Sequence, residues 1–371
     1  MKQLESFTIE EFRGLKALEL QGLGRVNLLF GLNNSGKTTV LEALSCYARP
    51  LDGLHWLSVA LRRFGVFPRG SRVQALKWLF PQTSNSSPDL LYEGGKVIFS
   101  AKGACPVARC EASLKEVVGY LSSSSGVEPE DLHGLADETS EEAAHRRGAQ
   151  LHMEIQKQHG DPERRQLTVW DERGMVRRET KPERSFPMSF ISLNDFRSSV
   201  GSAARFSEVR QLGLYNEAIE VLRRLDPGVR EILVLSGSRG LSVLYIEHSR
   251  TGLTPLSVCG DGMQRAVQIA FTVPLVKGGV LLVDEIESAL HVSVLAQVYE
   301  LLATACEEHD VQLFATTHSL EAVDAILKSE SGRKEGVVAY RLPQAGAQEK
   351  PARFSGEMLH RLRYERGLDV R

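Results

Sequence analysis

The chain has 371 residues, of which 42% are hydrophobic and 25% are charged. This composition is typical of a folded, water-soluble protein with one large domain or two smaller ones. Its formal charge of −2 argues against a uniformly basic nucleic-acid binder. No apolar run approaches the roughly 20 residues of a membrane-spanning helix, so we expect no membrane insertion. The N-terminus lacks the apolar core of a signal peptide, which indicates a cytoplasmic protein.

The cysteines are five in number and irregularly spaced, which favours free thiols in a reducing compartment over disulfides or a zinc site. They are Cys46, Cys105, Cys110, Cys259 and Cys306.

The first part of the chain, residues 1–49, reads as a group of strands followed by a loop and a helix. Apolar residues near alternating positions in 7–12, and the segments LKALEL and RVNLLF, predict strands. RVNLLF runs directly into GLNNSGKTT and then into VLEALSCYA, whose apolar spacing is helical.

The middle part, residues 50–187, differs in composition from the first part. It contains turn-rich stretches such as PQTSNSSPDL and LSSSSGVEPEDLHG, and dense charge of both signs over 141–185. We interpret it as an α+β insertion or arm and not as a separate catalytic domain.

The last part, residues 188–371, alternates apolar strands with amphipathic helices. VLLVDE and VQLFATTHS are continuous apolar runs, as expected of buried parallel strands. A helix capped by Ser207 is expected between FISL and EILVLS. This alternation predicts an α/β fold with a mainly parallel sheet covered on both faces.

One loop carries the strongest chemical signal. GLNNSGKT matches G-x-x-x-x-G-K-[ST], in which backbone N–H groups and a helix N-terminus face phosphate oxygens. Lys37 is expected to reach the β- and γ-phosphates of ATP, and the Thr38 hydroxyl is expected to bind Mg²⁺. The candidate nucleotide-binding residues here are Gly31, Asn33, Asn34, Ser35, Gly36, Lys37, Thr38 and Thr39.

Two adjacent carboxylates close the apolar run VLLV. We expect Asp284 to hold Mg²⁺ and Glu285 to polarise the attacking water, because buried carboxylates at a strand end need a cationic partner. His318 follows the next apolar strand, where an imidazole can sense the γ-phosphate. Lys37, Glu285 and His318 are therefore the candidate catalytic residues.

A second glycine-containing helix start lies at CGDGMQR. Gly260, Asp261 and Gly262 open this helix and form a second candidate anion-binding end.

Residues 53–88 mix basic and aromatic side chains, which suits single-stranded nucleic acid. The alternative is that the aromatics are core and the arginines a solvated face. The basic residues are Arg62, Arg63, Arg69, Arg72 and Lys77, and the aromatic ones are Trp56, Phe64, Phe67, Trp78 and Phe80.

The order of these motifs resembles the ABC-type ATPase heads of the OLD and RecF/SMC-like group, often described as AAA-family ATPases. The resemblance rests on IEEFRGLKALELQGLGRVNLLFGLNNSGKTTVLEAL, GDGMQRAVQIA, VLLVDEIESALHVSVL and LFATTHSLEAV. It covers residues 1–49 and about 188–371. It implies an ABC-type P-loop ATPase head with an antiparallel N-terminal strand region, and a contact of Arg13 with the nucleotide.

The resemblance also implies assembly. Heads of this group form a homodimer or a higher even oligomer around ATP, with Gly260, Asp261 and Gly262 on the nucleotide of the other subunit. Residues 288–291 resemble the D-loop, with His291 where transporters carry aspartate. The signature of the group usually reads L-S-G-G-Q or L-S-D-G-T, and here CGDGM stands in its place without the serine.

OLD-type proteins usually continue into a Toprim nuclease domain, which we do not find here. We therefore expect a separately encoded effector such as a Toprim or HNH nuclease, as in the anti-phage systems Septu and PARIS, which such stand-alone ATPases resemble. The main alternative is a RecF/SMC-like DNA-repair ATPase that acts directly on DNA. A transporter subunit is a weaker alternative, because it predicts an unmodified L-S-G-G-Q signature. A P-loop kinase is also weaker, because the separate CGDGM element and His318 argue against it.

Overall fold

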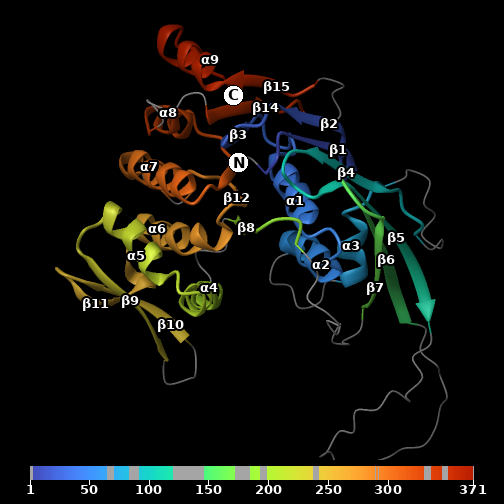
Figure 1. Ribbon diagram of the computed structural model, residues 1–371, viewed down its shortest axis with the longest axis horizontal. Coiled ribbons are helices and arrows are strands. Elements are labelled where there is room, and N and C mark those ends of the chain that lie inside the picture. The colour runs from blue at the N-terminus through green and yellow to red at the C-terminus, as the bar shows by residue number, and fades with distance from the viewer. Residues whose placement is uncertain are drawn as a thin grey trace, which may run out of the picture.

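The computed structural model describes residues 3–64, 71–82, 92–119, 146–171, 184–192, 199–236, 242–288, 290, 292–329, 336–344 and 350–370. Its elements form a mainly parallel sheet, a large antiparallel sheet and a small third sheet (Figure 1).

The mainly parallel sheet has the strand order β15-β14-β3-β13-β12-β8. All of its neighbouring pairs are parallel except β14 with β15. The central strands are fully buried, which explains their continuous apolar sequence. The strands are β3 (Val26–Phe30), β8 (Met188–Ile191), β12 (Val280–Val283), β13 (Gln312–Thr316), β14 (Val337–Arg341) and β15 (Ala352–Ser355).

This strand order brings the predicted motifs together. The glycine-rich loop follows β3, Asp284 follows β12, and His318 follows β13, which lies between the other two. Because parallel strands end at the same edge of a sheet, all three motifs meet there.

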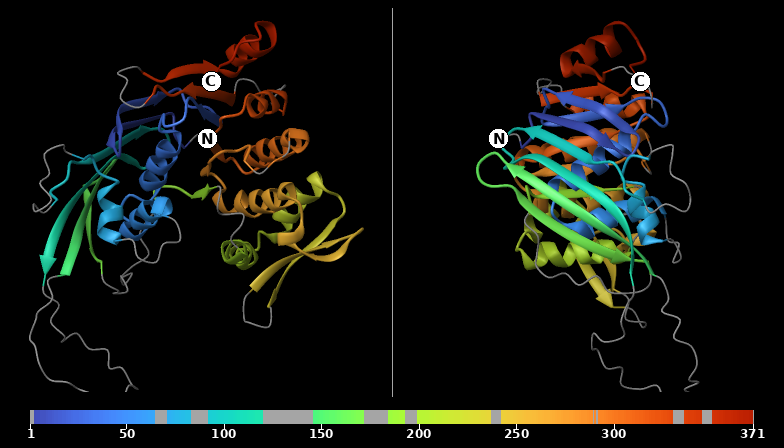
Figure 2. Two further views of the ribbon diagram at one scale, coloured as in Figure 1. Left: turned by 180° about the vertical axis from the view of Figure 1, so that it is seen from behind. Right: turned by 90° about the vertical axis from the view of Figure 1, so that its right-hand side faces the viewer.

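The antiparallel sheet has the order β2-β1-β4-β5-β6-β7. It joins the N-terminal hairpin to four strands of the 50–187 segment in one curved layer (Figure 2). Four strands of the expected insertion therefore continue the sheet of the N-terminal strands. The strands are β1 (Ser6–Phe12), β2 (Leu15–Gln21), β4 (Val97–Lys102), β5 (Val107–Gly119), β6 (Arg146–Lys157) and β7 (Glu163–Trp170).

Helix α1 (Lys37–Ala48) connects the two sheets. It contacts β1 on one side and β8, β12 and β13 on the other, and almost every residue in it is buried. A hydrophobic cluster runs from the antiparallel sheet through α1 to α2 (Gly53–Leu61) and α3 (Arg72–Lys77).

A second hydrophobic cluster fills the other face of the parallel sheet. It includes α4 (Ser199–Gln211), α5 (Tyr215–Leu225), α6 (Asp261–Thr272), α7 (Val292–Glu308), α8 (Leu320–Ser329) and α9 (Gly356–His360). The third sheet, with the order β11-β10-β9, lies beside α4 and α5. Its strands are β9 (Val229–Ser236), β10 (Ser242–His248) and β11 (Gly252–Pro255). Single-turn helices are η1 (Arg62–Phe64), η2 (Leu256–Val258), η3 (Pro274–Val276) and η5 (Arg361–Glu365).

The mixed α/β fold with a mainly parallel sheet and an antiparallel N-terminal region, expected of an ABC-type head, is confirmed. One helix start differs: Ser207 lies inside α4, where its hydroxyl donates to the Ala203 carbonyl at 3.0 Å, and does not cap it. None of the helices in the described ranges is long and apolar enough to span a bilayer.

Candidate active site

The loop between β3 and α1 has the backbone of a phosphate-binding loop. Gly31, Asn34 and Gly36 have φ angles of 147°, 63° and 86°. A Cβ at Gly31 would lie 2.8 Å from the Leu342 carbonyl oxygen, and one at Gly36 would lie 2.6 Å from Leu15 Cδ2. Both motif glycines are therefore favoured by their positive φ angles, and Gly31 is also required by the backbone oxygen beside it.

Lys37 folds back over this loop. Its Nζ donates to the carbonyls of Gly31 and Leu32, both at 2.9 Å. The side chain is buried, and that burial lowers the Lys37 pKa, while Asp284 and Glu285 oppose the shift. The loop thus holds an ammonium group at its centre, where an anion is the natural partner.

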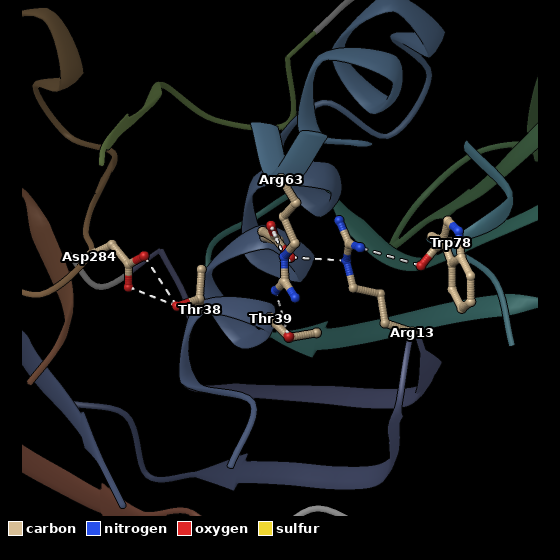
Figure 3. Close-up of polar contacts among 7 residues, drawn as sticks. Arg13, Thr38, Thr39, Arg63, Trp78 and Asp284 are labelled. Carbon is tan, nitrogen blue, oxygen red and sulfur yellow. Dashed lines mark hydrogen bonds and ion pairs between the residues drawn. The ribbon is translucent and has the colours of Figure 1, made fainter. Parts of the chain in front are cut away.

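The magnesium ligands predicted from sequence meet in the structure. Thr38 Oγ1 lies 3.1 Å from both carboxylate oxygens of Asp284, and dashed lines mark the two contacts in Figure 3. Thr316 Oγ1, at the end of β13, donates to Asp284 Oδ1 at 2.6 Å.

This pair of oxygen ligands fits Mg²⁺, which prefers hard oxygens and keeps water and substrate phosphates as its remaining ligands. Within the described ranges, no group of three or more His, Cys, Asp or Glu is arranged to hold a metal. The site is accordingly suited to a metal that arrives with phosphate oxygens.

Glu285 stands next to this site in a strained conformation. Its φ is 44°, and its N–H donates to Thr316 Oγ1 at 2.7 Å. Burial raises the Glu285 pKa, and the charges of Asp284 and Glu287 raise it further. A raised pKa increases the proton affinity of the carboxylate, which suits a general base.

His318 lies beside the same carboxylates. Its backbone N–H donates to Glu287 Oε1 at 2.7 Å, and its side chain is close enough to lower the Glu285 pKa. The structure thus brings together the three candidate catalytic residues, Lys37, Glu285 and His318, at one edge of the sheet.

Arg13 lies in the turn between β1 and β2. It is on the side of the start of α1 that faces away from Asp284 (Figure 3). Its Nε is 3.0 Å from Glu42 Oε2, and its Nη1 donates to the Trp78 carbonyl at 3.4 Å. Arg63 also binds Glu42, through bonds of 2.9 and 2.7 Å, and its Nη2 donates to Thr39 Oγ1 at 2.9 Å. Two guanidinium groups therefore share one buried carboxylate beside the phosphate-binding loop.

The signature-like element occupies a different place. Gly260 and Asp261 are exposed at the start of α6, and a Cβ at Gly260 would meet no atom of the described residues within 4 Å. Helix α6 packs on α4, α5 and α7, whereas α1 packs on α2 and on strands of both sheets. The helix start that contains Gly262 is therefore open, and its helix packs on elements other than those around the phosphate-binding loop.

Residues 152–324 match the family described as "AAA domain, putative AbiEii toxin, Type IV TA system". Among curated proteins, the chain is 38% identical over 78 residues to the uncharacterized protein MJECL11 of Methanocaldococcus jannaschii, covering 21% of this chain and 67% of that protein. The chain belongs to the same family as MJECL11. It is also 30% identical over 93 residues to MJECL10 of the same organism, covering 25% of this chain and 37% of that relative.

Solved structures with a similar fold include SMC heads and RecF, each 12% identical to this chain. An SMC head bound to the C-winged helix domain of ScpA has a TM-score of 0.48, and the match covers 99% of this chain and 100% of that chain. The SMC head from Thermotoga maritima has a TM-score of 0.41, with 95% and 99% coverage. The recombination mediator RecF has a TM-score of 0.40, with 95% and 98% coverage.

The AAA-domain match and the assembled loop support a P-loop ATPase. The match covers the Asp284, Glu285 and His318 segment, and the phosphate-binding loop lies before it in sequence.

Four residues near the site were not anticipated. Thr316 ends β13 and Glu287 lies in the segment after β12, and the adjacency of these two strands is the signal that could have found them. Glu42 and Arg63 meet only through tertiary packing, and no motif announces their contact. Ala289 and His291 of the D-loop segment lie outside the described residues.

Most basic and aromatic residues of 53–88 have partners inside the protein. The Arg62 guanidinium lies 4.2 Å from the centre of the Phe190 ring, and Lys77 pairs with Glu116 at 3.0 Å. Trp56 and Phe80 are fully buried. Phe67 and Arg69 lie outside the described residues, as does the side chain of Phe64. DNA contact through this segment stays a prediction.

Proposed function

We propose that this protein is a Mg²⁺-dependent ATPase that dimerises around ATP and regulates a separately encoded effector. The observation that carries the ATPase part is the meeting of Thr38, Asp284 and Thr316 directly beside Glu285. Strand ends that are far apart in sequence would thus supply a metal site and a base beside the phosphate-binding loop.

The loop residues would bind the triphosphate. Lys37 would exchange its two carbonyl acceptors for phosphate oxygens, which pair better with an ammonium group. Thr38 and Asp284 would hold Mg²⁺, which supplies charge neutralisation for the phosphates when bound.

Glu285 would orient and deprotonate the attacking water, because its raised pKa gives the carboxylate proton affinity. His318 would hold the γ-phosphate end through its side chain. The Glu287 carboxylate fixes the backbone of the His318 loop by accepting its N–H.

A second subunit would complete the site. Leu32 in the phosphate-binding loop is 65% exposed, and Val258, just before the signature-like element, is 69% exposed. These are large apolar side chains on the two surfaces that a dimer would bring together. The open helix start at 260–262 can then face the nucleotide of its partner and exclude water.

The effector part of the proposal rests on the anti-phage resemblance and on the family description, which names a toxin–antitoxin system. The alternative, an ATPase acting directly on DNA, requires basic surface that the 53–88 segment largely uses for internal contacts. DNA-stimulated turnover by the protein alone would favour that alternative.

Light scattering of Glu285→Gln with and without ATP and Mg²⁺ tests the dimer. We expect ATP to double the mass, and Gly262→Arg in the same background to prevent this while nucleotide binding persists. Gly336→Arg is the matched control, because Gly336 lies at the amino end of β14, whereas the nucleotide motifs follow the carboxyl ends of their strands. Among the described residues, its added Cβ would contact only Arg25 Cβ, at 3.8 Å. A mass that ATP does not change would contradict the proposal.

A further inference from the structure

A cavity of about 580 Å³ opens on the side of α1 away from Asp284. Its lining includes Arg13, Gly14, Lys16, Arg63, Trp78 and Phe80. Among the described lining residues, three carry positive charge and none is acidic. The volume lies within the range of ordinary small-molecule sites.

This cavity adjoins the phosphate-binding loop through two contacts. Arg63, in its wall, donates to Thr39 Oγ1 in the first turn of α1. Leu15, between the lining residues Gly14 and Lys16, lies so close to Gly36 that a Cβ there would approach it to 2.6 Å. The cavity is therefore reached from the loop without crossing another element.

The charges in its wall do not cancel. Glu42 is the carboxylate shared by Arg13 and Arg63, so the group carries one positive charge in excess. The Arg13 side chain is 10% exposed, and its buried Nη2 has no hydrogen-bond partner among the residues that the structure describes. A buried guanidinium nitrogen without an acceptor is costly, which indicates that a ligand supplies one.

The two ends of the site differ in chemistry. Figure 3 shows Thr38 and Asp284 on one side of the start of α1, and Arg13 and Trp78 on the other. Trp78, whose side chain is 48% exposed, would lie at the other end of a nucleotide that bound its terminal phosphates at the metal ligands and ran past the start of α1.

We propose that this cavity holds the base and ribose of the nucleotide, with the Trp78 indole stacked on the base and Arg13 bound to an oxygen of the ligand. The inference rests on the proposed ATPase function and extends it. Arg63 and Trp78 both come from the 50–187 segment, so that segment would form a wall of the nucleotide site and bind the nucleoside directly.

The test compares binding of ATP with binding of inorganic tripolyphosphate, which has no base, by calorimetry. Trp78→Ala should weaken ATP binding roughly 10-fold or more, as expected for the loss of base–aromatic stacking. It should leave tripolyphosphate binding unchanged, and Trp78→Phe should retain most of the ATP affinity. Tyr364→Ala, a similarly exposed aromatic on η5 at 44%, is the control and should change neither.

Equal affinities for ATP in Trp78→Ala and the parent would overturn the inference, and so would equal weakening of both ligands. Lys37→Ala separates this failure from that of the ATPase itself. If Lys37→Ala loses both ligands while Trp78→Ala loses neither, the phosphate site stands and the base pocket falls. If Lys37→Ala binds both as the parent does, the phosphate site falls as well.

Discussion

The two sides of the start of α1 are built in opposite ways. On the metal side, Thr38 follows the loop after β3, Asp284 follows β12 and Thr316 is the last residue of β13. These three parallel strands are neighbours, so the sheet brings the three residues together. On the cavity side, Arg13, Arg63 and Trp78 come from a hairpin turn, η1 and the end of α3. The first arrangement follows from strand order, whereas the second needs the antiparallel sheet and two helices to pack correctly.

This contrast predicts different responses to mutation. The metal side lies on rigid, buried strands, so changes there should alter turnover more than stability. The cavity side is held together by the Glu42 carboxylate, so loss of that charge should alter stability.

The largest change in stability is expected for Glu42→Gln. It leaves two guanidinium groups against a neutral amide at a position only 2% exposed. Breaking a buried pair of this kind typically costs about 3 kcal/mol in the free energy of unfolding. Chemical denaturation measures the loss.

Glu154→Gln is the matched control for that measurement. Glu154 pairs with Arg164 at 3.0 Å, but the two side chains are 40% and 74% exposed. The control should lose little or no stability, because water and salt screen an exposed ion pair. Equal losses in the two variants would show that the Glu42 cluster does not hold the cavity side together.

A smaller effect is expected for Thr316→Val, which keeps the shape of the side chain. The hydroxyl donates to Asp284 and accepts from the Glu285 N–H, so its loss removes one hydrogen bond from each of these two residues. Turnover should fall roughly 10-fold, in line with the loss of a hydrogen bond to a charged group. ATPase assays over a range of Mg²⁺ concentrations measure it, and unchanged turnover would remove Thr316 from the site.

The smallest effect is a change in pH dependence in Glu287→Gln. Glu287 raises the Glu285 pKa, so removing its charge should lower that pKa. Glu285 must be ionised to act as a base, so the acid limb of the kcat profile should move to lower pH. The glutamine oxygen can still accept the His318 N–H, which keeps the loop in place. A limb that stays in place or moves upward would contradict the assignment of Glu285 as the base.

The same contrast explains how much of the molecule could be predicted from its sequence. The apolar runs ending at Phe30, Val283 and Thr316 predict buried parallel strands, and the motifs after them meet because such strands end together. The parallel sheet and the grouping of Lys37, Asp284 and His318 were therefore within reach of sequence reasoning.

The cavity side was not within reach. The ion pair of Glu42 with Arg63 spans 21 positions and depends on how α2 packs against α1. The 50–187 segment was interpreted as an arm, because nothing in its local pattern shows that β4 pairs with β1. Ser207 was misread because a serine inside a helix can bond to the carbonyl four residues earlier, as well as cap a helix start.

The most direct test of the account is ATP turnover by Glu285→Gln beside the parent, with ATP binding measured on the same samples. Lys37, Thr38 and Asp284 survive in this variant, so ATP should bind as tightly as in the parent. Turnover should fall about 100-fold or more, because the base that orients the attacking water is gone. Parent-like turnover by Glu285→Gln would contradict the account.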